Sequence, residues 1–565
     1  MGGTEVAAER SVGGVPVQSV EDLFRRLEQL NAIGASLSAE RDINRLLESI
    51  LLAAKAITRA DGGTLYLLTE EDGTQRLKFE IMRTQSLNIA MGGTTGTPIP
   101  FYPIHLYSKD GKPNNQMVAA FAALTGQTVN IADAYTAEGF DFNGTRNFDK
   151  KTGYRSKSFL TVPMKNHENE IIGVLQLINS LDPDGGAVVA FSDADQRLAE
   201  SLASQAAIAL TNRQLINQLE ALFESFIAMI NTAIDEKSPY TGGHCQRVPE
   251  LTMMLAEAVN DTKQGALMDF DMTDKDRYEL KIAGLLHDCG KVTTPVHVVD
   301  KATKLESIFD RIHLIDTRFE VLKRDAEIEL LKGKAALLQQ GQDEVSLRGQ
   351  TNQLEQAYKA RVRQFDQDRE FLRKCNIGGE FMPVEAQDHV KAIAGYKWLD
   401  QSGNTAHFLT DDEVENLAIP RGTLTAKERE IINYHIVATI KMLEALPWPK
   451  HLRHVPEYAG GHHERMDGKG YPRGLKRDQM SVQARVMGIA DIFEALTARD
   501  RPYKKGKTLT ESLQILGKFK EGGHIDPDLF DIFIRQKVYQ RYAEQFLDAN
   551  QIDRVDESKI PGYSP

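Results

Sequence analysis

Histidines and acidic residues form short motifs in the C-terminal half of this 565-residue chain. His287 and Asp288 are adjacent at the end of an apolar stretch, and the pair His462 and His463 precedes a glycine-rich turn. Imidazole nitrogens and carboxylate oxygens bind divalent metals, and one carboxylate can bridge two ions because each oxygen binds a different one. The sequence therefore predicts a centre for two metals, with Asp288 as the bridging ligand. The side chains available to it are His244, His287, Asp288, His435, His462, His463 and Asp491.

Each of these motifs has a simpler explanation when it is taken alone. Isolated His-Asp pairs arise by chance, and an exposed loop can contain two histidines without binding a metal. His313 is also an alternative to His435, because it follows Lys304-Leu305 much as His435 follows Leu424-Thr425. Spacing favours His435, and the combination of motifs favours a metal site over each chance explanation.

Composition restricts the class of protein. The formal net charge is −12 and no basic block is present, which argues against non-specific binding to nucleic acid. No window approaches about eighteen consecutive apolar residues, so we expect no membrane span. The three cysteines have no paired spacing, which favours a reducing cytoplasm over a disulfide framework. Residues 1–19 lack the basic start and apolar core of a signal peptide, and we expect a disordered leader there.

The region 20–192 combines helical and strand-like patterns. Apolar residues recur at helical spacing between 20 and 58, which predicts two helices. Strand-like segments follow at 63–68, 76–83, 159–165 and 171–180. Helices beside an antiparallel sheet predict an α+β domain.

Two segments of this region, Asn147–Ser158 and Gly173–Asn179, together resemble a GAF domain. The resemblance is greatest to the GAF domains of cyclic-nucleotide phosphodiesterases, which carry an Asn-Lys-Phe-Asp-Glu signature. The chain keeps three of the five residues and replaces the lysine and the glutamate; the positions are Asn179, Ser180, Phe191, Asp195 and Gln196. The resemblance implies a cyclic nucleotide as ligand, whereas the two replacements leave open a dimerisation or signal-relay module without a ligand.

A continuous helix is predicted from 193 to 235. Its apolar residues recur with heptad spacing, which predicts a parallel coiled coil in a homodimer. An amphipathic helix packed on its own domain would show the same periodicity. If the coiled coil forms, a change in the GAF domain reaches the C-terminal half through this helix. One series recurs at every seventh residue and consists of Leu202, Ala209, Ile216, Phe223 and Ile230; Leu219 and Phe226 occupy the second apolar position of the heptad.

An insertion is predicted over residues 305–420. The segment 304–374 is highly charged and lacks strand alternation, and Gly341 lies near its middle. These features favour a protruding helical hairpin whose polar surface faces solvent or a partner. The following stretch, 376–403, is expected to be irregular.

Five further motifs lie in the segments Ile227–Val299 and Gly422–Phe533. They are Tyr240–His244, His287–Lys291, Leu424-Thr425 ahead of His435, His462–Pro472, and Ala490–Thr497 leading to Asp500–Tyr503. Together they resemble the HD-GYP family of cyclic-dinucleotide phosphodiesterases, part of the HD phosphohydrolase superfamily. The resemblance implies an all-α HD-type domain over 236–535, followed by a tail over 536–565. It also implies metal-dependent hydrolysis of cyclic di-GMP to pGpG, and onward to GMP, by a hydroxide held between two metals.

The resemblance also implies roles for individual residues. His244, His287, Asp288 and Asp491 would bind one metal, and Asp288, His435, His462 and His463 the other. Lys291 would contact the scissile phosphate, and Arg501 and Lys504 would grip the phosphates and bases of the substrate. Tyr240 stands where part of the family has an acid that holds a third metal, so two metals are expected. Asp235 and Glu236 lie close enough in sequence to leave a third metal open. Iron or manganese suits such a site, although affinity alone would favour zinc.

Two other functions remain open from the sequence. The domain could bind a nucleotide or a partner without turnover, or it could hydrolyse another cyclic dinucleotide such as cyclic GMP-AMP. The full set of ligands favours an enzyme, because a module that only binds does not need every one of them. No residue of the sequence distinguishes the two substrates.

Overall fold

The computed structural model describes residues 11–12, 15–108, 110–183, 185–237, 243–341, 343–379, 381–400, 402–499 and 506–564. The chain divides into two compact units, residues 1–223 and 224–565. Of the predicted leader, residues 1–10 and 13–14 lie outside the described residues, and β1 (Ser11–Val12) pairs with β2 (Val15–Pro16). Among the described residues, no helix is both long and apolar enough to cross a membrane.

The N-terminal unit is built on an antiparallel eight-stranded sheet in which β5, β4, β3, β9, β8 and β7 follow one another. In addition, β6 pairs with β4, and β10 pairs with β9. All four predicted strands are confirmed, as β3, β4, β8 and β9. The strands are β3 (Ala60–Glu71), β4 (Thr74–Thr84), β5 (Ile89–Gly92), β6 (Ile104–His105), β7 (Val129–Ile131), β8 (Phe159–Lys165), β9 (Ile171–Leu181) and β10 (Val188–Val189).

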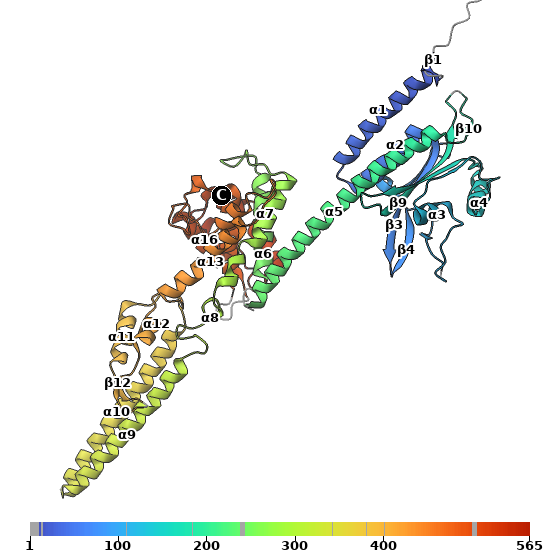
Figure 1. The fold of residues 1–565 in the computed structure, drawn as a ribbon. Coiled ribbons are helices and arrows are strands. Elements are labelled where there is room, and N and C mark those ends of the chain that lie inside the picture. The colour runs from blue at the N-terminus through green and yellow to red at the C-terminus, as the bar shows by residue number, and fades with distance from the viewer. Residues whose placement is uncertain are drawn as a thin grey trace, which may run out of the picture. The chain divides into compact units, whose positions relative to one another are not determined.

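Helices cover both faces of this sheet (Figure 1). The two predicted N-terminal helices, α1 (Val17–Ala39) and α2 (Ile43–Thr58), pack with the start of α5 (Asp193–Lys237) against one face. Helix α3 (Val118–Thr125) supplies small apolar residues to the opposite face, and α4 (Asn143–Thr152) precedes β8. The unit is therefore α+β, as predicted.

The C-terminal unit is mostly helical. Its helices are α6 (His244–Asn260), α7 (Asp274–Leu286), α8 (Val296–Val299), α13 (Ala426–Glu444), α14 (Val455–Gly460), α15 (Val482–Thr497), α16 (Leu509–Glu521), α17 (Pro527–Arg535) and α18 (Val538–Phe546), with 3-10 turns η2 (Cys289–Thr293) and η3 (Arg477–Gln479). Side-chain caps fix where several begin: Thr273 and Asp276 form a capping box at α7, as do Thr425 and Glu428 at α13. Tyr542 of α18 is buried against Phe493 of α15, so residues beyond 535 belong to the same core.

The insertion contains the predicted helical hairpin, formed by α9 (Ile312–Gln339) and α10 (Glu344–Asn376), which lie side by side (Figure 1). Gly341 adopts a φ of 63° in the turn between them. The stretch 376–403 is less irregular than expected. It contains α11 (Val384–Ala394) and β11 (Lys397–Leu399), which pairs with β12 (Thr405–His407) ahead of α12 (Asp411–Leu417). These elements share a core with the hairpin through Phe319, Phe365 and Phe408.

Helix α5 carries an exposed apolar stripe. Leu202, the first residue of the predicted heptad series, is instead buried in the core of the N-terminal unit. Ile216 of that series is exposed. Five other exposed apolar residues further along α5 are spaced alternately by four and three positions, which is the spacing of a two-stranded coiled coil. We call them the α5 stripe: Leu215, Leu219, Leu222, Phe226 and Met229.

Candidate metal centre

The end of α7 places His287 and Asp288 in the interior of the C-terminal unit. His287 follows the last residue of α7, and Asp288 precedes the 3-10 turn η2, where the chain packs against α13. Gly290 makes this approach possible, because a Cβ there would overlap the backbone of His435 and Thr439. Its amide donates a hydrogen bond to Thr439 Oγ1 at 2.9 Å. The glycine thus brings Asp288 and His435 into the same site.

Seven side chains from distant parts of the sequence converge there. Three sets of them each place one nitrogen or oxygen per residue within 4.8 Å of the others. We call His244, His287 and Asp491 the first group, and His435, His462 and His463 the second group. The third set, His287, Asp288 and His462, overlaps both. The structure therefore brings together all seven residues that the sequence singled out.

Asp288 lies between the two groups. Its Oδ2 is 3.1 Å from His244 Nε2 in the first group, and its Oδ1 is 3.4 Å from His435 Nε2 in the second. The carboxylate is 2% exposed. Each oxygen therefore faces a different group, which is the arrangement that a bridging carboxylate requires.

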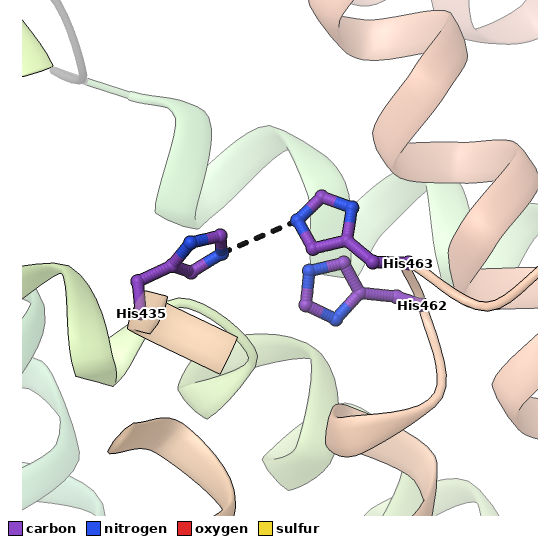
Figure 2. A group of neighbouring side chains, drawn as sticks. All are labelled: His435, His462 and His463. Carbon is purple, nitrogen blue, oxygen red and sulfur yellow. Dashed lines mark hydrogen bonds between the residues drawn. The ribbon is translucent and has the colours of Figure 1, made fainter. Parts of the chain in front are cut away.

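Three of the imidazoles are oriented in the same way. In His287, His435 and His462, Nδ1 lies 2.7, 2.5 and 2.6 Å from the carbonyl oxygen three residues earlier, of Gly284, Ile432 and Ala459. Because a carbonyl can only accept, Nδ1 carries the proton and Nε2 keeps its lone pair. Figure 2 shows His462 and His463 leaving the same loop toward His435, with 3.2 Å between Nε2 of His463 and Nε2 of His435.

A carboxylate holds the fourth imidazole. Glu494 Oε2 is 2.6 Å from His244 Nδ1, and Arg247 Nε donates to the other oxygen of Glu494 at 2.8 Å. Glu494 is fully buried. Glu494 was not among the site residues predicted from the sequence. A usable signal was its spacing, because Glu494 lies one helical turn after Asp491, as Arg247 does after His244.

Two buried atoms of the centre are left without a partner. His462 Nε2 and Asp288 Oδ1 accept no hydrogen bond from any described residue. A buried polar atom without a partner is costly, and a cation would satisfy both lone pairs. The donor set of nitrogen and carboxylate oxygen, together with these two atoms, fits divalent metal ions.

Burial and neighbouring charges set the protonation of the centre. Burial, together with His463 and His287, holds the pKa of His462 well below its usual value, and burial lowers the pKa of His463 to about 4. Burial opposes ionisation of Asp288, but Lys291 and His287 hold its pKa well below the usual value. Near neutral pH these groups are therefore neutral imidazoles and an ionised carboxylate, the forms that bind metals.

His244 differs from the other histidines. Burial opposes its protonation, but Glu494 and Asp288 nevertheless raise its pKa to about 9. The carboxylate of Asp491 is 3.4 Å from its Nε2. Carboxylates therefore lie on both sides of the His244 ring, and a proton on His244 offsets their negative charge. A bound cation could take the place of that proton.

The remaining candidate residues are placed as follows. Lys291 Nζ donates to Asp288 Oδ2 at 2.5 Å, at the edge of the centre. Arg501, Lys504 and Tyr240 lie outside the described residues. His313 has a side chain that is 79% exposed and lies on the insertion, so it does not replace His435.

A cavity of about 610 Å³ opens beside the centre. His462, His463 and Asp491 form part of its wall, and Arg465 and Lys507 are among its basic residues. This volume lies in the range of cavities that bind small organic ligands, roughly 300 to 1,000 Å³. The clustered side chains are therefore accessible to a ligand of that size.

In the N-terminal unit, the GAF signature residues hold the fold together. Asn179, at a φ of 58°, accepts from Lys157 N at 2.7 Å and donates to Arg155 O at 2.8 Å. Asp195 forms a buried ion pair with Arg26 of α1 and accepts from Ser192 Oγ. The polar atoms of these two residues are therefore engaged with the protein itself.

Family models match both units of the chain. A GAF domain model matches residues 42–210, and HD domain models match residues 241–350 and 410–529. The two HD matches leave most of α10 and all of α11 between them.

Similar curated proteins are phosphodiesterases. A 3′3′-cGAMP-specific phosphodiesterase of Vibrio cholerae is 43% identical over 88 residues, which are 15% of this chain and 20% of that protein. A cyclic di-GMP phosphodiesterase of Thermotoga maritima is 28% identical over 199 residues, 31% of this chain and 52% of the relative. One from Pseudomonas aeruginosa is 43% identical over 74 residues, 13% of this chain and 17% of the relative. The chain thus spans about half or less of the length of these relatives.

All seven clustered side chains lie within the two HD matches. The α+β unit lies mainly within the GAF match, and the helical unit mainly within the HD matches and the insertion between them. The chain is accordingly a protein in which a GAF domain precedes an HD domain, and its candidate metal centre belongs to the HD domain.

Proposed function

We propose that the protein is a metal-dependent phosphodiesterase of the HD-GYP type that hydrolyses cyclic di-GMP to pGpG. The observation that carries this proposal is the convergence of seven imidazole and carboxylate side chains into two groups that share Asp288. The relatives named as cyclic di-GMP phosphodiesterases support the choice of substrate. Further hydrolysis of pGpG to GMP belongs to the same proposal.

The residues of the centre have defined roles in this proposal. The first group would hold one divalent ion and the second group the other, with Asp288 between them, and the bound ions supply the Lewis acid charge that phosphodiester hydrolysis requires. Lys291 places an ammonium group beside Asp288, where it donates to a phosphate oxygen and offsets developing charge. Water adds to phosphorus, the bond from phosphorus to the 3′ oxygen breaks, and that oxygen leaves as a hydroxyl group. Iron or manganese is the proposed metal, since open sites of histidine and carboxylate with water suit them.

The test combines metal analysis with product analysis. Purified protein should contain close to two metal ions per chain after loading with Fe(II) or Mn(II), and it should convert cyclic di-GMP to pGpG. If the protein binds the nucleotide tightly but forms no product with either Fe(II) or Mn(II), it is a receptor and not an enzyme. Arg501 and Lys504 would contact the substrate, and their replacement by alanine should raise KM.

A second candidate substrate is 3′3′-cGAMP, because one of the similar relatives is specific for it. Both cyclic dinucleotides should be supplied together at equal concentration in one reaction. Faster loss of cyclic di-GMP supports the first proposal, and faster loss of cGAMP supports the second.

We also propose that the GAF domain regulates the enzyme and that two chains associate through α5. A cyclic nucleotide is the proposed GAF ligand. Titration with cAMP or cGMP should change the hydrolysis rate, and calorimetry should detect binding. Absence of binding would reduce the GAF domain to a scaffold.

A further inference from the structure

Part of the wall of the cavity beside the metal centre is aromatic. Phe519 and His524 line it, with ring centroids 4.7 Å apart and planes inclined by 31°. The amide of His524 donates to the carbonyl of Phe519 at 2.8 Å, which closes the loop that carries both rings. The two rings therefore form one aromatic surface that faces the cavity.

The loop of this aromatic surface is tied to the motif that carries the metal-binding histidines. Met466 N donates to His524 O at 3.2 Å, and Asp467 N donates to Gly523 O at 3.0 Å. Gly470 permits a tight turn after these residues, because a Cβ there would overlap the backbone of Glu464 and Arg465. His463, in turn, stacks on Tyr471 with centroids 4.8 Å apart. The aromatic surface and the histidines His462 and His463 thus line the same cavity, and backbone hydrogen bonds join the segments that carry them.

Basic side chains form part of the wall of this cavity. Arg465, Lys469 and Lys507 are among the residues that line it. Asp467 holds the guanidinium of Arg465 in a two-bonded pair, at 3.0 and 2.7 Å, and fixes its direction. The side chain of Lys469 is 78% exposed, and its Nζ lies 3.9 Å from Asp467 Oδ2. Such a mixture of aromatic rings and cations recognises a nucleobase together with a phosphate.

We propose that this cavity binds the half of a cyclic dinucleotide that is not being cleaved. Its purine base stacks on Phe519 and His524, and its phosphate faces Lys469 and Lys507, while the other phosphate lies at the metal centre. This inference rests on the proposed function and adds to it the basis for selecting a dinucleotide over a simple phosphodiester. Helix α15 supports the same arrangement, because it carries Asp491 and then continues along the cavity as Ile492, Ala495 and Leu496.

The test compares two phosphodiesters, of which only one carries a second nucleotide that can occupy the cavity. Cyclic di-GMP has a second nucleotide, and bis(p-nitrophenyl) phosphate has none. Phe519→Ala should raise KM for cyclic di-GMP roughly tenfold, because one stacked base is lost. It should leave kcat/KM for bis(p-nitrophenyl) phosphate within about twofold. Equal losses with both substrates, or no loss with cyclic di-GMP, would overturn the inference.

A variant at an exposed lysine provides a second test, which does not depend on whether Phe519→Ala folds. Lys469→Ala should also raise KM for cyclic di-GMP and leave KM for bis(p-nitrophenyl) phosphate unchanged. Lys518→Ala makes the same change at an exposed position outside the cavity lining, and it should change neither KM. Similar effects of the two lysine changes would count against the inference. If the unaltered protein hydrolyses neither substrate, the proposed function fails. Calorimetry then decides the inference separately, since Phe519→Ala either weakens cyclic di-GMP binding roughly tenfold or leaves it unchanged.

Discussion

The imidazole of His435 is the residue on which the second group most depends. Its Nε2 faces both Asp288 and His463, so its removal separates the shared carboxylate from that group. We expect His435→Ala to lose one metal per chain and to fall in kcat by more than the roughly 10- to 100-fold typical of replacing a residue that only supports a ligand. Metal analysis and product formation measure both effects.

His313→Ala is the matched control for this variant. His313 occupies a comparable sequence setting, but its side chain is exposed on the insertion. Metal content and rate should be unchanged. Equal metal loading of His435→Ala and the unaltered protein would remove His435 from the centre.

Glu494 controls the first group without belonging to it. Its carboxylate fixes the proton of His244 on Nδ1, so that Nε2 faces Asp288 and Asp491. Glu494→Gln keeps the size but loses the charge, and we expect metal affinity to fall roughly 10- to 100-fold. At saturating metal the rate should largely recover, because the ligands themselves remain. A titration of activity against Mn(II) concentration measures this effect.

Glu279→Gln provides a control with the same chemistry away from the centre. Glu279 is also buried and also accepts from a histidine, with Oε1 2.6 Å from His454 N and Oε2 3.2 Å from His454 Nδ1. Both variants can lose stability, but only Glu494→Gln should shift the metal titration. A shift of similar size in both would mean that Glu494 acts through stability alone.

At the scale of elements, the contact between η2 and α13 determines whether the two groups meet. Gly290→Ala inserts a methyl group against the backbone of His435 and Thr439. We expect a loss of about 1–3 kcal/mol in unfolding free energy, as for other overpacked sites, and a large loss of activity because Asp288 moves from His435. Denaturant unfolding and the hydrolysis assay measure the two effects.

Gly349→Ala tests the same substitution where space is open. Gly349 lies within α10, and a Cβ there meets no heavy atom within 4 Å. Alanine should stabilise the helix by up to about 1 kcal/mol and leave activity unchanged. If Gly290→Ala behaves in the same way, close packing at η2 does not position the centre.

Elements with a strong local pattern could be predicted from the sequence. The α9–α10 hairpin followed from its helical composition and from Gly341, and β8 and β9 followed from strand-like runs around a polar turn. Helix α11 was missed in the stretch 376–403, because only Val390 and Ile393 of its residues are buried and the periodic signal is weak. Packing against the α9–α10 hairpin, which the local sequence does not encode, stabilises it.

The site, too, could be predicted only as far as residue type and local spacing reach. Residue type and spacing singled out the seven clustered side chains, and their role as ligands stays a prediction. Glu494 was missed because its spacing from Asp491 was the available signal, and its contact with His244 depends on the packing of two helices that are distant in sequence. Phe519 and His524 were missed because their contact arises from a loop whose closure depends on backbone hydrogen bonds to the turn after His463.

At the scale of the whole molecule, the α5 stripe indicates how two chains associate. Its residues alternate by four and three positions, and Leu219 and Leu222 are 64% and 53% exposed. Two copies of α5 side by side would bury these residues in a parallel coiled coil.

Leu222→Glu should convert a two-chain species into single chains, because it places two carboxylates opposite each other in an apolar contact. Light scattering coupled to gel filtration measures the mass. Leu331→Glu, the same change at a leucine that is 57% exposed on α9, should leave the mass unchanged. A single-chain mass for the unaltered protein at micromolar concentration, or a two-chain mass for Leu222→Glu, would show that α5 does not join the chains.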